Sequence, residues 1–378
     1  MSCDGASRRW PLSAPDLLGE AQRPAPASVP VSAGAVAGFD VGGTNIRAEV
    51  LGADPSAGVG VRRSDRPETM AGITEAICDM VASFESELSV PVGAVGVGCA
   101  GLVGRSGVVT TSPNIPAIDD FPLRAELAER LARPVTVDND ATAALRGEME
   151  GGAADGFSDG LLCTFGTGIG AATLLDGAIR RGAHGLAGEA GHMVVAPEGP
   201  ECLCGRRGCW ERVASGDALG RAARAAAEAG RAPALRERVA GRVGDLRGRH
   251  VGELATAGDP VARRLLRECS RWVALGLNNL ILLIDPEVVV LGGGLSELGE
   301  VFLAPVRDEL AEIYIDQERR PPVAVRPARH GDRAGVIGAA RLALDDLAGA
   351  GFGGLDGAPV DEAPRGGPLR HGADALAR

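Results

Sequence analysis

The chain contains no lysine, so all 39 of its basic residues are arginine. The missing lysine excludes a Walker A phosphate loop, Schiff-base chemistry and a lysine general base. The formal net charge of −11 argues against a nucleic acid partner, because phosphate binding needs a net basic face. No apolar run reaches the length of a membrane span, and VSAGAVAGF at 31–39 is too short for one. We therefore expect neither nucleic acid nor membrane as a partner.

A signal peptide is also lacking, so we expect a cytoplasmic protein with reduced cysteines. The length of 378 residues predicts two domains, or two lobes of one enzyme. Residues 1–34 are rich in Pro, Ala and Ser and predict a disordered leader. Residues 350–378 have a similar composition and predict a disordered tail.

Three of the eight cysteines crowd into eight positions and follow a histidine. His192, Cys202, Cys204 and Cys209 form a complete tetrahedral ligand set for zinc, with no position left for catalytic water. The alternative is a set of scattered small core residues, since free cysteine is usually just buried. The crowding favours a structural zinc loop at 192–209, and the acid Glu189 beside it is expected to do something else.

Two stretches predict a strand, a tight glycine turn and a returning strand. The first runs from Val36 to Val50, and the second runs from Leu161 to Leu175. The turn residues are Gly42, Gly43, Thr44 and Asn45 in the first, and Gly166, Thr167 and Gly168 in the second. Their amides and hydroxyls could cradle a phosphate, and Asp40 could hold a hydrated Mg²⁺ beside it. The alternative is a plain hairpin turn. Two such hairpins, one opening each lobe, predict a duplicated fold in which both clamp one polyphosphate.

A strand predicted at 134–137 ends in the cluster Asp138, Asn139 and Asp140. Open α/β folds place their chemistry at the carboxyl ends of strands, so Asp140 is our candidate general base. Asn139 would be a hydrogen-bonding neighbour in the substrate site. The alternative is an Asx cap on a helix that begins at Ala141, which accounts for one acid of the pair. Asn114, in a loop between prolines, could bind sugar hydroxyls or could simply be a turn residue.

The strand predicted at 286–291 runs into Gly292, Gly293 and Gly294. Such a glycine run lets the backbone approach a ligand closely, which favours a nucleotide-side loop as much as simple packing. Further predicted elements are a strand at 92–99, helices at 71–88, 121–131, 217–240 and 259–283, a strand at 323–326 and a helix at 335–344.

Taken together, these motifs resemble the ROK family of bacterial repressors, open-reading-frame proteins and sugar kinases. The resemblance covers roughly 36–345 and is closest in pattern to the zinc-containing bacterial glucokinases. Its pieces are DVGGTNIR at 40–47, VDNDATAA at 137–144, FGTGIGAA at 165–172, GLAGEAGHMVV at 185–195, CLCGRRGCWE at 202–211, LGGG at 291–294 and GVIGAA at 335–340.

The resemblance implies an actin-like fold of two α/β lobes around a cleft. The first lobe would span 35–140 and be completed by a C-terminal helix at 335–348, and the second would span 141–334. ATP would lie between the two glycine hairpins, with the LGGG loop at the adenosine. The sugar would be bound by Asn114, Asp140, Glu189, His192 and Glu211, and Asp140 would take the proton of a primary hydroxyl. Members of this family are often homodimers, so the resemblance also implies a homodimer.

The chain departs from the glucokinase pattern at positions that flank the sugar site. Thr142 stands where Asn is common, Arg212 and Val213 where Gln-Tyr is frequent, and the loop after Asn114 lacks the usual Trp. The catalytic motifs are intact, so glucose is the first candidate substrate, but these departures favour weighing other substrates beside it. N-acetylmannosamine, another hexose and a sugar-like C7 cyclitol of the valiolone type remain alternatives. A sugar-sensing ROK repressor would need an N-terminal DNA-binding domain, which about 34 turn-rich residues are not expected to supply.

Overall fold

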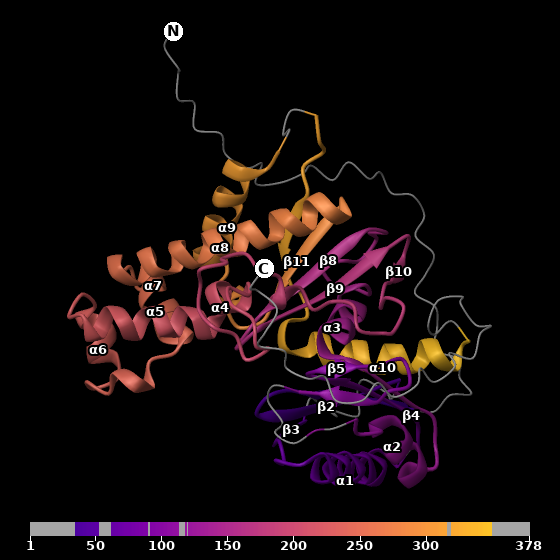
Figure 1. Cartoon of the computed structure of the whole chain (residues 1–378). Coiled ribbons are helices and arrows are strands. Elements are labelled where there is room, and N and C mark those ends of the chain that lie inside the picture. The colour runs from indigo at the N-terminus through magenta and orange to yellow at the C-terminus, as the bar shows by residue number, and fades with distance from the viewer. Residues whose placement is uncertain are drawn as a thin grey trace, which may run out of the picture.

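The computed structural model describes residues 35–52, 62–89, 91–112, 118, 120–315 and 319–349. Most of these residues fold into two lobes, each built on a five-stranded sheet (Figure 1). The predicted disordered leader and tail, and Asn114, lie outside the described residues. None of the helices in the described ranges combines the length and the apolar character needed to cross a bilayer.

The first sheet has the strand order β3-β2-β1-β4-β7. Its strands are β1 (Ala35–Val41), β2 (Asn45–Leu51), β3 (Arg62–Asp65), β4 (Val92–Cys99) and β7 (Val135–Asn139). β2 runs antiparallel to both β1 and β3, whereas β1, β4 and β7 are parallel. The same lobe contains α1 (Met70–Leu88), α2 (Leu123–Leu131) and the small ribbon of β5 (Leu102–Val103) and β6 (Val109–Thr111).

The second sheet repeats this pattern in the order β10-β9-β8-β11-β12. Its strands are β8 (Gly160–Phe165), β9 (Ile169–Leu175), β10 (Ala178–Ile179), β11 (Val288–Gly292) and β12 (Ala324–Pro327). Here too an antiparallel hairpin, β8–β9, is followed by parallel strands β11 and β12. The two sheets thus share one topology, which agrees with the duplication that the two glycine hairpins predicted.

The remaining helices connect the strands and cover the sheets. They are α3 (Asp140–Glu148), α4 (Glu211–Ala214), α5 (Gly216–Glu228), α6 (Pro233–Arg238), α7 (Gly248–Thr256), α8 (Pro260–Ile284), α9 (Glu300–Ile313) and α10 (Ala334–Leu347). Short 3₁₀ turns are η2 (Ala190–His192), η3 (Val243–Asp245), η4 (Ser296–Leu298) and η5 (Gly331–Arg333). The helix predicted over 217–240 was wrong in extent, because α5 ends at Glu228 and Gly230 adopts a positive φ of 70°.

Alternating residues of β1 face opposite sides of the first sheet, as the period of a strand requires. Ala37, Phe39 and Val41 pack in the core that contains α1 and α2. The opposite face has small residues, and α10 lies directly on it. A Cβ on Gly38 would lie 2.0 Å from the Val336 carbonyl oxygen, and one on Gly96 would lie 1.8 Å from that of Ala339. Only glycine lets the helix backbone come this close to the strands.

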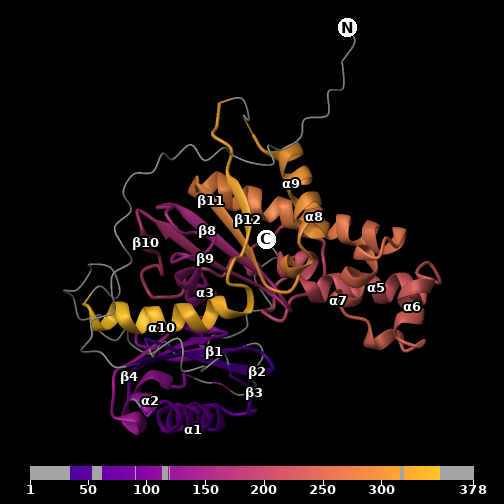
Figure 2. The same cartoon turned by 180° about the vertical axis from the view of Figure 1, so that it is seen from behind.

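Helices α3 and α10 pack against each other where the two lobes meet, as both views show (Figures 1 and 2). Gly338 allows this contact, since a Cβ there would lie 1.6 Å from the Ala143 carbonyl oxygen. Arg146 of α3 also holds Asp345 of α10 through two hydrogen bonds of 2.7 and 3.0 Å. The middle and the last turn of α3 are thereby held against α10, which itself lies on the first sheet.

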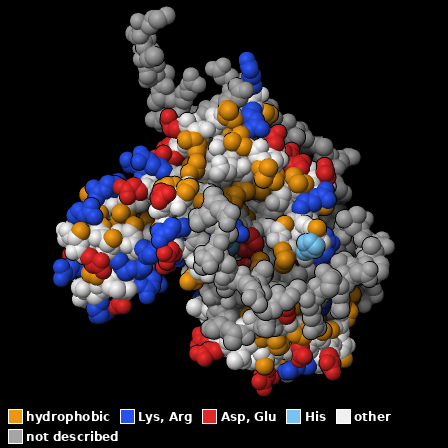
Figure 3. Space-filling view, viewed as in Figure 1, with side chains coloured by type: hydrophobic (Ala, Val, Ile, Leu, Met, Phe, Trp, Pro, Cys, Tyr) orange, Lys and Arg blue, Asp and Glu red, His pale blue; other side chains and the backbone are white. Residues whose placement is uncertain are grey.

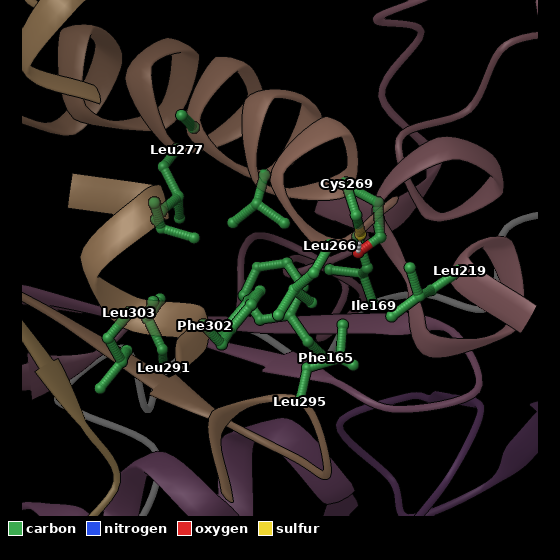
Figure 4. Packing of buried hydrophobic residues seen from close by; sticks show 14 of the residues in the cluster. Phe165, Ile169, Leu219, Leu266, Cys269, Leu277, Leu291, Leu295, Phe302 and Leu303 are labelled. Atoms are coloured by element: carbon green, nitrogen blue, oxygen red, sulfur yellow. Dashed lines mark hydrogen bonds between the residues drawn. The ribbon is translucent and has the colours of Figure 1, made fainter. Parts of the chain in front are cut away.

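The core of the second lobe lies between its sheet and α5, α8 and α9 (Figure 4). Phe165 at the end of β8 is its centre, with edge-to-face contacts to Trp210 at 5.6 Å and Phe302 at 6.0 Å between ring centroids. The Trp210 indole N–H donates to the Trp272 carbonyl oxygen over 2.7 Å. Because Trp210 follows Cys209 directly, this core also fixes the end of the cysteine-rich loop.

Candidate functional site

The first hairpin presents its turn at the edge where β1 ends. The Gly42 N–H donates to the Asn45 carbonyl oxygen over 3.0 Å, which closes the turn. Arg66 secures it from the side, because its Nε donates to the Gly43 carbonyl oxygen over 3.0 Å. The Thr44 side chain is exposed, and its hydroxyl accepts a hydrogen bond from the side-chain amide Nδ2 of Asn45 over 2.6 Å. The turn is therefore a rigid loop with an outward hydroxyl.

Asp40 lies on the α10 side of the sheet, directly below this turn. Its Oδ2 is 3.3 Å from Arg47 Nη1, and Arg47 Nη2 is 3.0 Å from Asp332 Oδ2. Burial raises the pKa of Asp40 to about 6, the negative charge of Asp140 adds to this, and Arg47 opposes it. A carboxylate that is 16% exposed in this position suits a hydrated Mg²⁺ beside a phosphate.

Asp140 opens α3 at the junction of the two lobes. Its Oδ1 accepts the Ala141 N–H over 2.9 Å. Burial raises the pKa of Asp140, and the charge of Glu189 raises it further against the hydrogen bonds from the helix start. A carboxylate that burial makes more basic is suited to accept a proton.

Asn139 acts as the helix cap. Its Oδ1 accepts from the Ala141 and Thr142 N–H groups, and its Nδ2 donates to the Gly101 carbonyl oxygen over 3.1 Å. The Asx-cap alternative thus holds for Asn139, and its contact with substrate stays a prediction. Asn139 is the N-cap of α3, and Asp140, the first residue of the helix, shares the Ala141 N–H with it.

The second hairpin and the glycine run after β11 lie against each other. The Leu295 N–H donates to the Phe165 carbonyl oxygen over 3.1 Å. Gly293 has a φ of 78°, and a Cβ there would lie 2.7 Å from the Phe165 nitrogen. A Cβ on Gly294 would meet no described atom within 4 Å, and the side chain of Thr167 is exposed. The structure brings these two predicted nucleotide-side segments together.

The four predicted zinc ligands lie around one point. The donor atoms of His192, Cys202, Cys204 and Cys209 are all within 4.8 Å of one another. Cys202 Sγ is 3.6 Å from His192 Nδ1, and Cys204 Sγ is 3.5 Å from Cys209 Sγ. A zinc tetrahedron with ordinary bond lengths has edges of about 3.5–3.8 Å, so the side chains present fit this metal.

Two acids flank this cluster. Glu189 Oε2 is 3.8 Å from His192 Nε2, and Glu211 Oε1 is 3.9 Å from His192 Nδ1. Burial raises the pKa of Glu189, Glu211 adds to the effect and His192 opposes it. Glu211 also lies against the second hairpin, since a Cβ on Gly168 would be 2.7 Å from Glu211 Oε2. The cysteine-rich loop therefore places these acids beside the hairpin turn.

The negative charges of these acids raise one another's pKa values, one after the next, across the two lobes. Asp140 raises the pKa of Asp40, Glu189 raises that of Asp140, and Glu211 raises that of Glu189. Figure 3 shows acidic side chains in the hollow at the centre of this face, between the lobes. The predicted catalytic, sugar-side and metal-side carboxylates thus interact electrostatically with one another.

Two charged residues near this site form a pair that the sequence did not predict. Asp138 on β7 and Arg181 after β10 form an ion pair of 2.6 Å in which both side chains are largely buried. Burial raises the pKa of Asp138, and the Arg181 guanidinium opposes this rise. The two residues are 43 positions apart in the chain, so no local pattern links them.

The sequence profile of the ROK family matches residues 36–346. The glucokinase of Streptomyces coelicolor is 37% identical over 315 residues, which cover 82% of this chain and 98% of the relative. An N-acetylmannosamine kinase of Escherichia coli is 30% identical over 316 residues, with coverage of 82% and 98%.

Among solved structures, a ROK family glucokinase from Streptomyces griseus, determined in complex with glucose and AMPPNP, is 40% identical. It superposes with a TM-score of 0.74 over 82% of this chain and 99% of its own. This likeness confirms the predicted actin-like arrangement of two α/β lobes. With the family profile spanning nearly all of the described body, the chain belongs to the ROK family.

Proposed function

We propose that this chain is an ATP-dependent kinase that phosphorylates a primary hydroxyl of a hexose, with glucose as the first candidate and glucose 6-phosphate as the product. The observation that carries this proposal is the placement of Asp140. Its partly buried carboxylate, whose pKa is raised by burial, opens α3 at the lobe junction, and it interacts electrostatically with Asp40 and with Glu189. The glucokinase relatives at 37% and 40% identity support the same reaction.

In the proposed reaction, Asp140 accepts the proton of the sugar hydroxyl as the hydroxyl oxygen attacks the γ-phosphorus of ATP. The new oxygen–phosphorus bond forms while the bond to the β-phosphate oxygen breaks, and ADP leaves. The amides and threonines of the two glycine turns would hold the phosphates. Positioning and charge stabilisation supply most of the rate in such reactions, which explains why the chain needs no lysine.

Two metals fit this scheme. Asp40 would hold a hydrated Mg²⁺, which supplies charge neutralisation at the phosphates. His192, Cys202, Cys204 and Cys209 would hold a structural zinc. His192 Nδ1 is the ring nitrogen near Cys202, so Nε2 is left on the side of Glu189. His192 would then bind metal with one nitrogen and a sugar hydroxyl with the other, which ties substrate orientation to the zinc loop.

Glu189 and Glu211 complete the proposed sugar site with His192, Asn139 and Asn114. Which hydroxyls they bind decides the substrate. N-acetylmannosamine is the second candidate, because N-acetylmannosamine kinases of Escherichia coli are 30% identical over almost their full length. The assignment of Arg212 and Val213 as substrate-selecting positions, and a homodimeric state, stay predictions.

A coupled ADP-release assay with ATP and Mg²⁺ tests the function. The panel is glucose, mannose, N-acetylmannosamine, allose, fructose and valiolone-type cyclitols. We expect the highest kcat/KM for glucose. A higher value for N-acetylmannosamine or for a cyclitol would replace glucose with that substrate. Sugar binding without ADP release from any of them would overturn the kinase and favour a sugar-sensing regulator.

A further inference from the structure

The segment 181–187 links the second sheet to the residues of the proposed sugar site. It begins two residues after the end of β10, and its two ends are joined, because the Ala187 N–H donates to the Arg181 carbonyl oxygen over 3.0 Å. Glu189 follows two residues later. We call residues 181–187 the closed loop.

The closed loop belongs to the second lobe by sequence, but its first side chain is fixed to the first lobe. Arg181 Nε lies 2.6 Å from Asp138 Oδ2, and the side chains of these residues are 12% and 5% exposed. The other Asp138 oxygen accepts the Asn139 N–H over 2.8 Å. Both oxygens of the carboxylate are therefore used, and the charges are paired away from water. Such a pair has a defined geometry, unlike an ion pair on the surface.

A second contact holds the same loop to the first lobe. Arg105, between β5 and β6, donates to the Gly182 carbonyl oxygen over 2.6 Å and to that of Ala183 over 3.2 Å. Gly185 has a φ of 85°, and a Cβ there would lie 2.7 Å from the backbone nitrogen of Arg105. The closed loop thus docks on the first lobe at two separate places.

The far end of the loop is held by the second lobe. Gly188 has a φ of 106°, and a Cβ there would lie 2.4 Å from the Ala171 carbonyl oxygen of β9. Glu189 follows at once. At the near end, Asp138 is two residues before Asp140 and is connected to it through Asn139, the cap of α3. One short path therefore runs from Glu189 through Arg181 and Asp138 to Asp140.

We propose that Arg181 and Asp138 are positioning residues that set the spacing between Asp140 on the first lobe and Glu189 on the second. This inference rests on the kinase function proposed above. A sugar held by Glu189 meets the base on the other lobe, so any change in the register between the lobes displaces the hydroxyl from Asp140. Displacements on the order of 1 Å can cost about 10²-fold in rate.

The position of the pair predicts which kinetic constants depend on it. Arg181 and Asp138 connect to the sugar-side acids and to the base, whereas the glycine turns have their own contacts through Arg66 and Leu295. Loss of the pair should raise KM for the sugar and lower kcat while KM for ATP stays near the wild-type value. A pair that only stabilised the fold would lower the melting temperature and leave both constants of the folded enzyme unchanged.

The test compares Arg181→Gln, Asp138→Asn and the double variant with Arg180→Gln in the full chain. Arg180 is the matched control, because its ion pair with Asp176 is exposed and lies next to Arg181 in the chain. We expect kcat/KM for the sugar to fall about 10²-fold in each single variant. The double variant should be no worse than either single one, because the two changes affect the same interaction. Arg181→Lys should recover part of the loss.

Wild-type turnover, measured in the same series, separates the two proposals. An inactive wild type overturns the kinase function. An active wild type together with Arg181→Gln and Asp138→Asn within twofold of Arg180→Gln overturns the positioning role. If Arg181→Gln does not fold, Asp138→Asn and Arg181→Lys provide the same comparison. Calorimetric glucose titration gives a readout independent of turnover, with about tenfold weaker binding expected only in the Arg181 and Asp138 variants.

Discussion

In the β1–β2 hairpin, the second residue pair from the turn is Asp40 and Arg47, whereas in the β8–β9 hairpin it is Thr164 and Gly170. The two hairpins belong to sheets of the same strand order, so these pairs occupy corresponding places. The first hairpin has a carboxylate and a guanidinium there, whereas the second hairpin has no charged residue from Phe165 to Leu175. The duplicated backbone has thus been kept while its charge differs between the lobes.

The helices that follow the last strand of each sheet differ in the same way. α3 begins with the carboxylate of Asp140, whereas α10 begins with Ala334 and Gly335. A Cβ on Gly335 would lie 3.0 Å from the Asp40 Cγ, so this end of α10 leaves space for the acid of the first lobe. Carboxylates in both copies would crowd negative charge around a triphosphate. At these corresponding positions the first lobe therefore has the acids, and the second lobe has small or uncharged residues.

The largest expected effect comes from removing the base at the start of α3. Asp140→Asn should lower kcat roughly 10³-fold, because general bases contribute factors of 10²–10⁴, while sugar and ATP binding survive. Asp176→Asn, at a carboxylate that is 89% exposed, is the control and should behave as wild type. Steady-state kinetics measure the change in kcat, and calorimetry measures the binding of sugar and ATP. A near-normal kcat in Asp140→Asn would reject Asp140 as the general base.

Asp40→Thr places a threonine in the first hairpin, as Thr164 stands at the corresponding position of the second hairpin. We expect kcat/KM to fall about 10²-fold with a higher requirement for Mg²⁺, since a ligand-side carboxylate is lost. In the wild type, kcat/KM should fall as the pH drops below about 6, the pKa of Asp40, because both acids must be ionised. Asp65→Asn, at an exposed acid of the same sheet, is the control. Wild-type activity in Asp40→Thr would show that the two hairpins are equivalent.

The raised pKa of Asp40 also has a consequence for stability. The folded state favours the protonated form of Asp40. The contribution of this group to the free energy of unfolding is therefore present below about pH 4 and is lost as the pH rises to about 6. Asp40→Thr should therefore raise the free energy of unfolding at pH 8, by at most about 3 kcal/mol. Urea unfolding at pH 8 checks the sign, and a less stable variant would contradict it.

The smallest effect is expected from the zinc loop, which has no counterpart in the sequence between β3 and β4 of the first lobe. Cys204→Ser should lose the metal, and KM for the sugar should rise roughly tenfold because His192 loses its fixed orientation. Metal analysis should give about one zinc per chain in the wild type and in Cys78→Ser, a cysteine outside the cluster. Zinc retained in Cys204→Ser would remove that residue from the ligand set.

Local signals were sufficient for much of the fold and for several parts of the site. The strand predicted at 92–99 and the strand predicted at 169–175 match β4 and β9, because apolar strands bounded by glycine turns have a clear pattern. The four metal-type ligands lie together as predicted, since a short loop contains three of them. The sheet duplication could be read from two hairpins alone.

Features that depend on distant contacts could not be predicted in this way. The break between α5 and α6 follows from Gly230 within a run that reads as one Ala-rich helix. Asn139 has the same sequence signal whether it caps α3 or faces a ligand. The Asp138–Arg181 pair joins segments 43 residues apart, and neither residue is surrounded by a motif that would indicate its partner.

The close packing of α10 on β1 and β4 has a consequence for the order of synthesis. Gly38 and Gly96 emerge from the ribosome long before Val336 and Ala339, which cover them in the finished protein. During translation, one face of the first sheet is therefore open while the whole second lobe is made. Domains usually fold from the N-terminal end as they emerge. In this chain the small cluster of Val36, Ala94, Ala340 and Ala343 can form only after the second sheet has been made, so the release of α10 sets the time at which the first sheet is covered on both faces.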